Sequence, residues 1–476
     1  MSPTDRQRIV ALDKRRVWHP YTAMDEYAAH VDPLVVVRAE GARLFDADGR
    51  SYLDANSSWW VAALGHGHPR LVAALERQAR AFPHVSLAGV THAPAAELAE
   101  ALCRVAPRSP LDRQPRSPLD QQPPSPLDHQ PRSPLVPQPN PEGRGGGLEH
   151  VFYSDDGSTA VEVALKLALQ YWAQNGRPER RAFVALEGGF HGETLGCTAI
   201  GGVEVFRRPF AGALAEVFHV ASPGDPERSL DEAVRALAAV LDRDGDRIAA
   251  MVLEPIVQGA AGMRVYDPAY LRAARELCDR HDLFLVADEV FSGYGRTGAM
   301  WACQHAGVSP DLLCTAKGFS GGMLPMAATL ATRRLFDGFL GAPERAFFYG
   351  HSFCGNPLGA AVALEVLRVI EEEKVLEAAA PKAARIARCF EALGELPGVA
   401  RTRAIGMIGA LDLAGDAGYL ARAGWRVYEE ARRRGAYLRP LGNVVYVTPP
   451  LVIADAELDE LLGIVAESVA AVAGGR

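Results

Sequence analysis

Short apolar segments alternate with amphipathic ones through the middle of the chain. Apolar runs of strand length recur at six places, namely 150–154, 182–187, 248–256, 283–290, 312–317 and 326–332. Between them, residues 157–172 carry apolar side chains at three- and four-residue spacing, which predicts a helix with one buried stripe. Short buried strands separated by helices favour an α/β domain whose mostly parallel sheet is covered on both faces.

The two ends of the chain are predicted to form a second, smaller α+β domain. Residues 35–55 alternate between apolar and polar like a strand meander, with a turn at Asp48-Gly49. Beyond about residue 350, helical segments lead to a second group of short strands at 407–413, 436–440 and 444–450. We therefore divide the chain into three parts: an N-terminal part of the small domain at 1–85, a large domain at 86–345 and a C-terminal part of the small domain at 346–476.

Residues 108–147 break this pattern. They contain four copies of an eight-residue unit that begins as RSPLDRQP, followed by NPEGRGGG. Proline removes backbone donors and disfavours helix at the preceding residue, so neither helix nor sheet can propagate through the repeats. We predict a flexible surface insertion in the large domain. A proline-rich docking ligand is the alternative interpretation.

Composition narrows the classes of partner. The 476 residues include 50 Lys and Arg against 58 Asp and Glu, and no dense basic block occurs, so nucleic acid is not an expected partner. The seven cysteines include no CxxC pair, which argues against a metal site and a disulfide framework and favours a reducing compartment. The chain also lacks an apolar stretch of signal-peptide or membrane-span type. We expect a cytoplasmic protein without a metal ion.

A candidate anion site begins the helix predicted at 157–172. The preceding strand ends, Gly157 permits a tight turn, and Ser158 stands in the first helical turn. Free N–H groups and the positive end of the helix dipole attract anions there, and a phosphate group is the expected ligand. Ser158 as a simple helix cap is the alternative interpretation.

A carboxylate and an amine end two of the apolar runs. Asp288 stands near the carboxyl end of the run at 283–290 and would be costly to bury without a cationic partner, although a strand-end cap or ion pair is the alternative. Lys317 closes the run at 312–317 before a glycine-rich segment, where desolvation would lower its pKa toward nucleophilic amine chemistry. Lysine, carboxylate and phosphate site together suggest pyridoxal 5'-phosphate, whose pyridine nitrogen an aspartate keeps protonated.

Six ordered motifs identify the chain as similar to a known family. GSTAVEVALK, FHGET, LEPIVQGAAGM, LVADEVFSGYGRTG, TAKGFSGG and GHSFCGNPLGAA resemble those of the class III, fold-type I pyridoxal-phosphate aminotransferases. The resemblance implies a large domain with a seven-stranded, mostly parallel sheet, a smaller α+β domain built from both termini, and a homodimer with active sites at the interface.

A narrower resemblance concerns the substrates. WHPYTAM, SSWWVAALGHGHP and LRPLGNVVYVTPP are similar to the members that transfer an amino group from S-adenosyl-L-methionine to 8-amino-7-oxononanoate in biotin synthesis. One alternative is a class III aminotransferase that acts on ω-amino acids or diamines, or that uses lysine as donor. A cofactor-binding protein that does not transaminate, such as an aminomutase or a regulatory module, is an alternative from another class.

The resemblance also assigns roles to individual residues around the cofactor. Lys317 would be the catalytic residue, joined to the cofactor and carrying the proton. The other cofactor contacts would be Gly157 and Ser158 at the phosphate, Asp288 at the ring nitrogen, Val290 beneath the ring, Phe190 stacked on it, Glu254 near the ring's O3', and Ser352 from the second subunit. Phe190 stands where this family often has Tyr, and Glu193 stands where relatives carry Asp.

The substrate side is assigned in the same way. Tyr21, Trp59 and Phe190 would wall the cleft, Arg296 and Gly350 would line it, and Arg439 would bind a substrate carboxylate through a bidentate contact. Two alternatives stay open at this point: Trp59 and Trp60 could be core aromatics, and Arg439 could belong to a surface ion pair.

Overall fold

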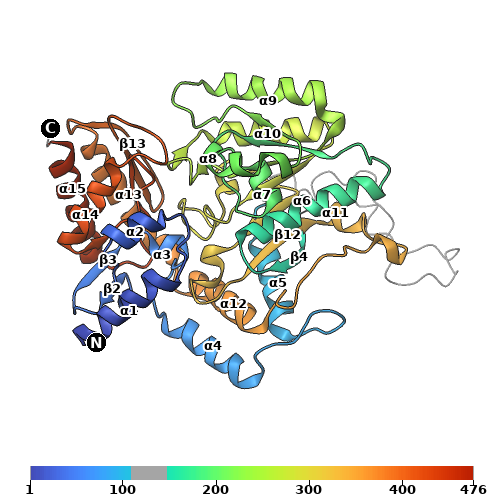
Figure 1. The fold of residues 1–476 in the computed structure, drawn as a ribbon. Coiled ribbons are helices and arrows are strands. Elements are labelled where there is room, and N and C mark those ends of the chain that lie inside the picture. The colour runs from blue at the N-terminus through green and yellow to red at the C-terminus, as the bar shows by residue number, and fades with distance from the viewer. Residues whose placement is uncertain (1, 109–146, 475–476) are drawn as a thin grey trace, which may run out of the picture.

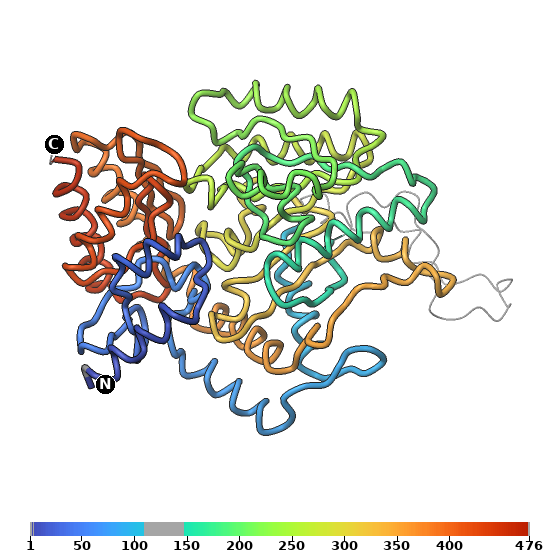
Figure 2. Tube along the Cα trace, in the orientation of Figure 1, coloured from blue at the N-terminus to red at the C-terminus, as the bar shows by residue number. Residues whose placement is uncertain are grey.

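The computed structural model describes residues 2–108 and 147–474, so the predicted insertion at 108–147 lies almost wholly outside the described residues. The described chain forms two domains (Figure 1). Both chain ends lie in the smaller domain, and the larger domain is formed by the middle of the chain (Figure 2).

A seven-stranded sheet runs through the large domain. Its order is β4 (Leu148–Ser154), β12 (Ala327–Thr332), β11 (Leu312–Thr315), β10 (Phe284–Asp288), β7 (Ile248–Leu253), β5 (Ala182–Leu186) and β6 (Val217–Val220). Only β12 runs antiparallel to its neighbours, β11 and β4. The predicted seven-stranded, mostly parallel sheet is therefore confirmed.

Helices cover both faces of this sheet because its strands are apolar on both sides. Along β10, Phe284 and Val286 pack with α6 (Gly157–Gln174), whereas Leu285 and Ala287 pack with α10 (Pro268–Arg280) on the opposite face. Elsewhere in the chain lie the helices and strands α3 (Ser57–Trp60), α4 (Pro69–Ala81), α5 (Ala93–Val105), α7 (Leu195–Ile200), α8 (Glu204–Arg207), α9 (Leu230–Asp244), β8 (Val257–Gln258), β9 (Arg264–Val265), α11 (Arg333–Asp337) and α12 (Pro357–Glu372).

The small domain joins the two ends of the chain. Its four-stranded sheet has the order β1 (Val36–Glu40), β2 (Arg43–Asp46), β3 (Ser51–Asp54) and β15 (Ala436–Tyr437), with the first three strands from the N-terminal end. β3 and β15 pair in parallel, with Asp54 opposite Tyr437. The small α+β domain built from both termini is thus confirmed, whereas its boundaries at residues 85 and 346 stay predictions.

A second sheet and five helices complete this domain. The sheet has the order β13 (Val399–Ile405), β14 (Ile408–Leu413) and β16 (Val444–Val447). The helices are α1 (Pro3–Arg16), α2 (Met24–His30), α13 (Val375–Leu393), α14 (Ala423–Arg434) and α15 (Asp455–Ala473). Within the described ranges, no helix has the length and apolar character needed to cross a membrane.

Candidate active site

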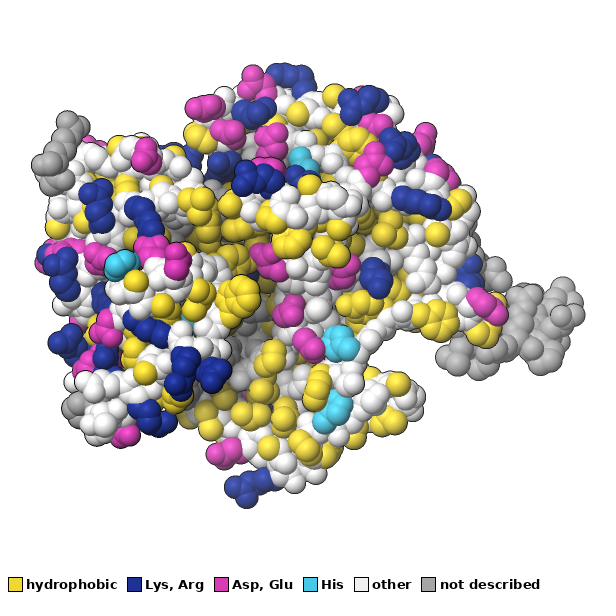
Figure 3. Space-filling model, viewed as in Figure 1, with side chains coloured by type: hydrophobic (Ala, Val, Ile, Leu, Met, Phe, Trp, Pro, Cys, Tyr) yellow, Lys and Arg dark blue, Asp and Glu magenta, His cyan; other side chains and the backbone are white. Residues whose placement is uncertain are grey.

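A cavity of about 530 Å³ lies where the two domains meet. On the face drawn in Figure 3, the surface is hollowed between the domains. The carboxyl ends of parallel strands share one edge of a sheet, and this edge brings together the residues that follow β5, β7, β10 and β11. Nine of the predicted site residues line the cavity: Tyr21, Trp59, Gly157, Ser158, Phe190, Glu254, Asp288, Val290 and Lys317.

The start of α6 forms one wall of the cavity. Asp156 caps the helix by accepting the N–H of Thr159 at 2.9 Å, while the N–H groups of Gly157 and Ser158 have no partner among the described residues. A Cβ on Gly157 would lie 2.7 Å from Cγ1 of Val290, so only glycine leaves this backbone approach open. Free amides at the positive end of an 18-residue helix provide a site that favours an anion such as a phosphate group.

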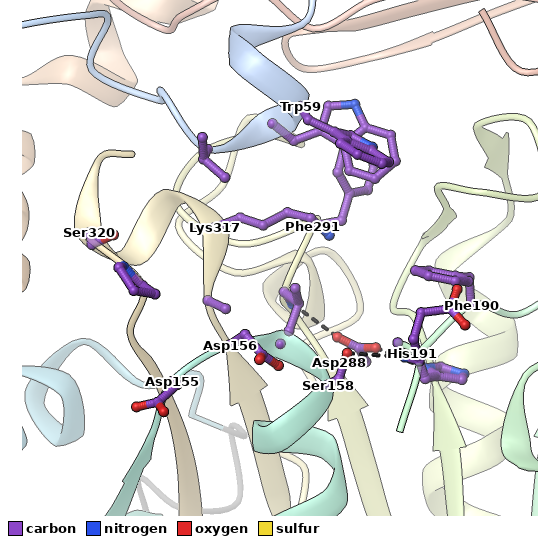
Figure 4. A pocket seen from close by; sticks show the side chains of 18 of the residues that line it. Trp59, Asp155, Asp156, Ser158, Phe190, His191, Asp288, Phe291, Lys317 and Ser320 are labelled. Atoms are coloured by element: carbon purple, nitrogen blue, oxygen red, sulfur yellow. Dashed lines mark hydrogen bonds and ion pairs between the residues drawn. The ribbon is translucent and has the colours of Figure 1, made fainter. Parts of the chain in front are cut away.

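Asp288 is buried at the end of β10 and is held on two sides. Its Oδ2 lies 2.7 Å from Nδ1 of His191, and its Oδ1 accepts the N–H of Val290 at 3.1 Å. Burial opposes the charged form of His191, but the hydrogen bond and the charge of Asp288 outweigh it and raise the histidine pKa above its ordinary value. His191 therefore acts as a donor that fixes the carboxylate beside the cavity (Figure 4).

Glu254 supports the loop that carries Phe190. Its carboxylate accepts the N–H of Phe190 at 3.0 Å and the N–H of Gly259 at 2.8 Å. Burial raises the pKa of Glu254 to about 7, and the neighbouring charge of His191 opposes that rise. Because these two amides donate to its oxygens, Glu254 holds together the backbone segments that contain Phe190 and Gly259.

Lys317 enters the cavity from a 3-10 turn at Lys317–Ser320, just beyond β11. Its Nζ lies 4.8 Å from the centroid of the Trp60 ring and has no hydrogen-bond partner among the described residues. Burial lowers the pKa of Lys317, although the charges of Asp288 and Glu254 oppose this shift. A desolvated amine without a bonded partner is suited to act as a nucleophile and as a proton carrier. Figure 4 shows its side chain between Trp59 and Asp288.

Three aromatic rings, those of Tyr21, Trp59 and Phe190, line the mouth of the cavity. The ring of Tyr21 meets those of Trp59 and Phe206 edge-on, with centroid distances of 5.6 Å and 5.5 Å. Its hydroxyl donates a hydrogen bond to Glu193. The ring of Phe206 in turn packs on those of Phe190 and Tyr419, with centroid distances of 5.9 Å and 5.0 Å. Phe206 and Tyr419 do not line the cavity but support these rings from outside; neither was predicted from the sequence, because neither belongs to a recognised motif.

The two tryptophans come from a turn with an unusual backbone. Residues Ser57–Trp60 all have positive φ, between 46° and 75°. A left-handed conformation costs a residue with a side chain about 1–2 kcal/mol, so tertiary contacts must offset roughly four such penalties. Trp60 is buried and packs on Phe291 at 4.6 Å, while Trp59 is half-buried, and both rings line the cavity. Trp60 is thus a core aromatic and a cavity wall at once.

Arg439 stands behind Trp59 rather than in the cavity lining. Its Cζ lies 4.2 Å from the centroid of the Trp59 ring, and its backbone N–H donates to Oδ1 of Asn56 at 2.6 Å. The guanidinium is half-buried and makes no ion pair with any carboxylate in the part of the chain that the structure describes. The alternative of a surface ion pair is therefore not observed.

Three predicted substrate or cofactor residues lie elsewhere. Contrary to expectation, Arg296 does not line the cavity, because its loop turns the side chain into the domain junction, where Nη1 donates to the carbonyl of Pro449 at 2.6 Å. Burial lowers the pKa of Arg296 to about 10. Gly350 and Ser352 are exposed and outside the cavity of this single chain, so their roles stay predictions.

Comparisons with known proteins agree with this geometry. The family model of class-III aminotransferases matches residues 26–114 and 142–469, leaving out 115–141 inside the predicted insertion. An adenosylmethionine-8-amino-7-oxononanoate aminotransferase of Geobacter sulfurreducens is 36% identical over the whole of both chains. The enzyme of the same name from Nitratidesulfovibrio vulgaris is 38% identical over 98% of this chain and 82% of its own length.

Solved structures give the same result. The adenosylmethionine-8-amino-7-oxononanoate aminotransferase of Methanocaldococcus jannaschii has a TM-score of 0.87 and 31% identity, covering 98% of this chain and 100% of that one. An amine transaminase from an uncultivated Pseudomonas species, in its PLP-bound form, has a TM-score of 0.83 and 30% identity over 96% of this chain and 99% of its own. The chain therefore belongs to the class III aminotransferases.

Proposed function

We propose that this aminotransferase uses pyridoxal 5'-phosphate to move the amino group of S-adenosyl-L-methionine to 8-amino-7-oxononanoate, which forms 7,8-diaminononanoate for biotin synthesis. The observation that carries the proposal is one cavity holding an unpartnered amine, a buried carboxylate and free helix amides. The substrate assignment is supported by full-length relatives named for that reaction at 36% and 38% identity.

The residues present fit this cofactor. The free amides of Gly157 and Ser158 would hold its phosphate, and Asp288 would face its ring nitrogen. The space that a Cβ on Gly157 would fill lies against Val290, which would pack beneath the ring. When bound, the cofactor supplies an electron sink that makes the α-proton of an amino donor removable.

Each protein group then has a defined task. Lys317 Nζ, with its lowered pKa, would accept the α-proton of the donor and deliver it in the second half of the transfer. Asp288, fixed by His191, would keep the ring nitrogen protonated. Glu254 would keep the Phe190 loop in place through its two backbone hydrogen bonds.

The mouth of the cavity suits two different substrates in turn. Ring faces such as that of Trp59 stack on adenine, attract a sulfonium cation and shield an aliphatic chain from water. Arg439, with its guanidinium over Trp59, would bind a substrate carboxylate. Phe190 can stack on the cofactor but contributes no phenolic hydroxyl there.

A second candidate function is transamination of ω-amino acids or diamines. It is favoured by structural similarity to the (S)-enantioselective omega-transaminase of Thermomicrobium roseum, which has a TM-score of 0.85 and 27% identity. Lysine as the amino donor belongs to the same candidate. These functions differ from the first in the donor that converts the cofactor to its amine form.

We also propose that the enzyme acts as a cytoplasmic homodimer. Ser352 is exposed and outside the cavity, as expected for a residue that reaches the site of a second subunit. Phe348 and Phe353 in the same loop are 78% and 58% exposed, which provides apolar surface for a partner copy. The cytoplasmic location is supported by the cysteines, all seven of which are free thiols.

The test is a panel of half-reactions. The purified holoenzyme is mixed with adenosylmethionine, lysine or a diamine, and the cofactor absorbance is followed in a single turnover. We expect adenosylmethionine to convert the cofactor to its amine form and 8-amino-7-oxononanoate to reverse the change. Conversion by lysine or a diamine, without any by adenosylmethionine, would select the second candidate.

A further inference from the structure

A buried carboxylate lies at the base of the left-handed turn that carries the two tryptophans. Asp54, the last residue of β3, is completely inaccessible to solvent. Its Oδ2 accepts the N–H of Ser58 at 2.6 Å and lies 2.9 Å from Nε2 of His66, while its Oδ1 accepts the N–H of Asn56 at 3.2 Å. Both oxygens are thus occupied by groups that fix the turn.

The hydrogen bonds around Asp54 continue through Asn56 to Arg439, on the proposed substrate-binding side of the small domain. Asn56 accepts the backbone N–H of Arg439 through Oδ1 at 2.6 Å, and its own carbonyl accepts the N–H of Trp60 at 2.8 Å. The backbones that carry Trp60 and Arg439 are therefore joined through a single asparagine, which Asp54 holds in turn. A change at Asp54 would be transmitted to both.

The turn needs such a support because its sequence does not favour it. Serine and tryptophan have no local preference for positive φ, and four consecutive residues adopt it here. The N–H groups of Asn56 and Ser58 both face one carboxylate in this geometry, which repays part of the backbone strain. Ser57 adds a hydrogen bond from its hydroxyl to the carbonyl of Thr448 at 2.6 Å.

We propose that Asp54 and His66 are positioning residues, which hold the Ser57–Trp60 turn in its left-handed form and thereby set the tryptophan rings and Arg439 for both substrates. Asp54 accepts the hydrogen bonds of the turn, and His66 orients the Asp54 carboxylate through Oδ2. Neither residue lines the cavity. The kinetic part of this inference rests on the proposed function, whereas its structural part does not.

The first variant to test is Asp54→Asn, which keeps the size of the side chain. One of its two polar atoms becomes an NH₂ group, and in either orientation this group faces a backbone N–H, that of Ser58 or of Asn56. The matched control is Asp46→Asn. Asp46 is also a buried carboxylate of the small domain and binds the Tyr52 hydroxyl at 2.9 Å and the Arg50 N–H at 2.8 Å, but it supports the turn between β2 and β3 instead.

A second pair of variants tests His66 and remains available if Asp54→Asn fails to fold. His66→Leu removes the donor to Asp54, whereas His66→Gln keeps an N–H at about the place of Nε2. We expect His66→Leu to behave like Asp54→Asn, and His66→Gln to restore wild-type behaviour. Equal defects in both histidine variants would contradict an orienting hydrogen bond from His66.

The structural readout needs no substrate. The full chain labelled with 5-fluorotryptophan gives six ¹⁹F signals, one for each tryptophan, and Trp59→Phe and Trp60→Phe assign the two that matter. We expect Asp54→Asn and His66→Leu to shift or broaden these two signals, while Asp46→Asn leaves them in place. If Asp54→Asn changes them no more than the control does, the inference is overturned.

The kinetic readout is the single-turnover rate constant of each half-reaction. A displacement of the rings and Arg439 by about 1 Å should lower both rate constants by about 10- to 100-fold, with pyridoxal-phosphate affinity unchanged. Altered ¹⁹F signals with wild-type rates would refute a positioning role. A wild-type enzyme that converts neither proposed substrate would refute the proposed function instead, and the ¹⁹F signals alone would then decide the role of Asp54.

Discussion

Replacing Gly157 by alanine tests the cofactor cradle at its tightest point. The added Cβ would lie 2.7 Å from Cγ1 of Val290 and 3.2 Å from its Cγ2, so rotation of the valine side chain cannot relieve both contacts. Without cofactor, Val290 can shift into the cavity that it lines. The bound cofactor ring would prevent this shift of Val290, so the substitution should weaken cofactor binding rather than destabilise the apoenzyme.

The magnitude follows from the cost of overpacking. About 1–3 kcal/mol is typical for an inserted methyl group, which corresponds to a Kd for pyridoxal phosphate raised about 5- to 150-fold. Titration of the apoenzyme by absorbance measures the Kd, and thermal unfolding of the apoenzyme reports whether stability has changed. We expect a large change in the Kd and a small change in the stability of the apoenzyme.

Gly463→Ala is the matched control. Gly463 lies inside α15, and a Cβ there would meet no atom within 4 Å. The substitution should raise stability by up to about 1 kcal/mol through helix propensity, and it should leave the Kd unchanged. An unchanged Kd in Gly157→Ala would refute the placement of the ring over Val290 and of the phosphate at the start of α6.

Three further outcomes are expected. Lys317→Ala should keep cofactor affinity within about tenfold but lose transamination, and borohydride treatment of the wild-type holoenzyme should label Lys317 in peptide maps. Attachment of pyridoxal phosphate to the apoenzyme, followed by stopped-flow absorbance, should accelerate with pH through a pKa below the ordinary lysine value of 10.5, because burial disfavours the ammonium form of Lys317; a midpoint at or above that value would contradict the shift. Arg439→Ala should raise the activation free energy of the half-reaction with 8-amino-7-oxononanoate by about 2–4 kcal/mol. Trp59→Ala should slow both half-reactions, and single-turnover rate constants would measure both effects.

The sequence predicted those site residues that follow strands of the parallel sheet. Asp288 and Lys317 each end an apolar run, and parallel pairing places such ends at one edge, so linear order was enough to bring them together. The edge strand β6 was missed because its four residues, VFHV, form a short run that a histidine interrupts. Apolar runs therefore predicted the inner strands that carry the cofactor residues, but not the edge strand β6.

The substrate side depended on tertiary contacts that sequence patterns do not record. Nothing in the residues at 57–60 indicates positive φ, which is imposed by partners such as Asp54 and Thr448. Arg296 was placed in the cleft by its motif, but the direction of its side chain depends on a carbonyl in a distant segment, that of Pro449. Phe206 packs on Tyr21 only because a four-residue helix, α8, brings it there.

The parallel pairing of β3 with β15 has a consequence for the order in which the enzyme matures. Leu53 is synthesised well before its partner Ala436, and the two strands can pair only when both are present. The strands of the large domain are complete by Thr332, so the sheet edge with Asp288 and Lys317 can assemble while the C-terminal strand is still missing. The Trp59 turn and Arg439 acquire their common support only when β15 closes this long loop. A nascent chain should therefore become competent to bind the cofactor before it can select a substrate.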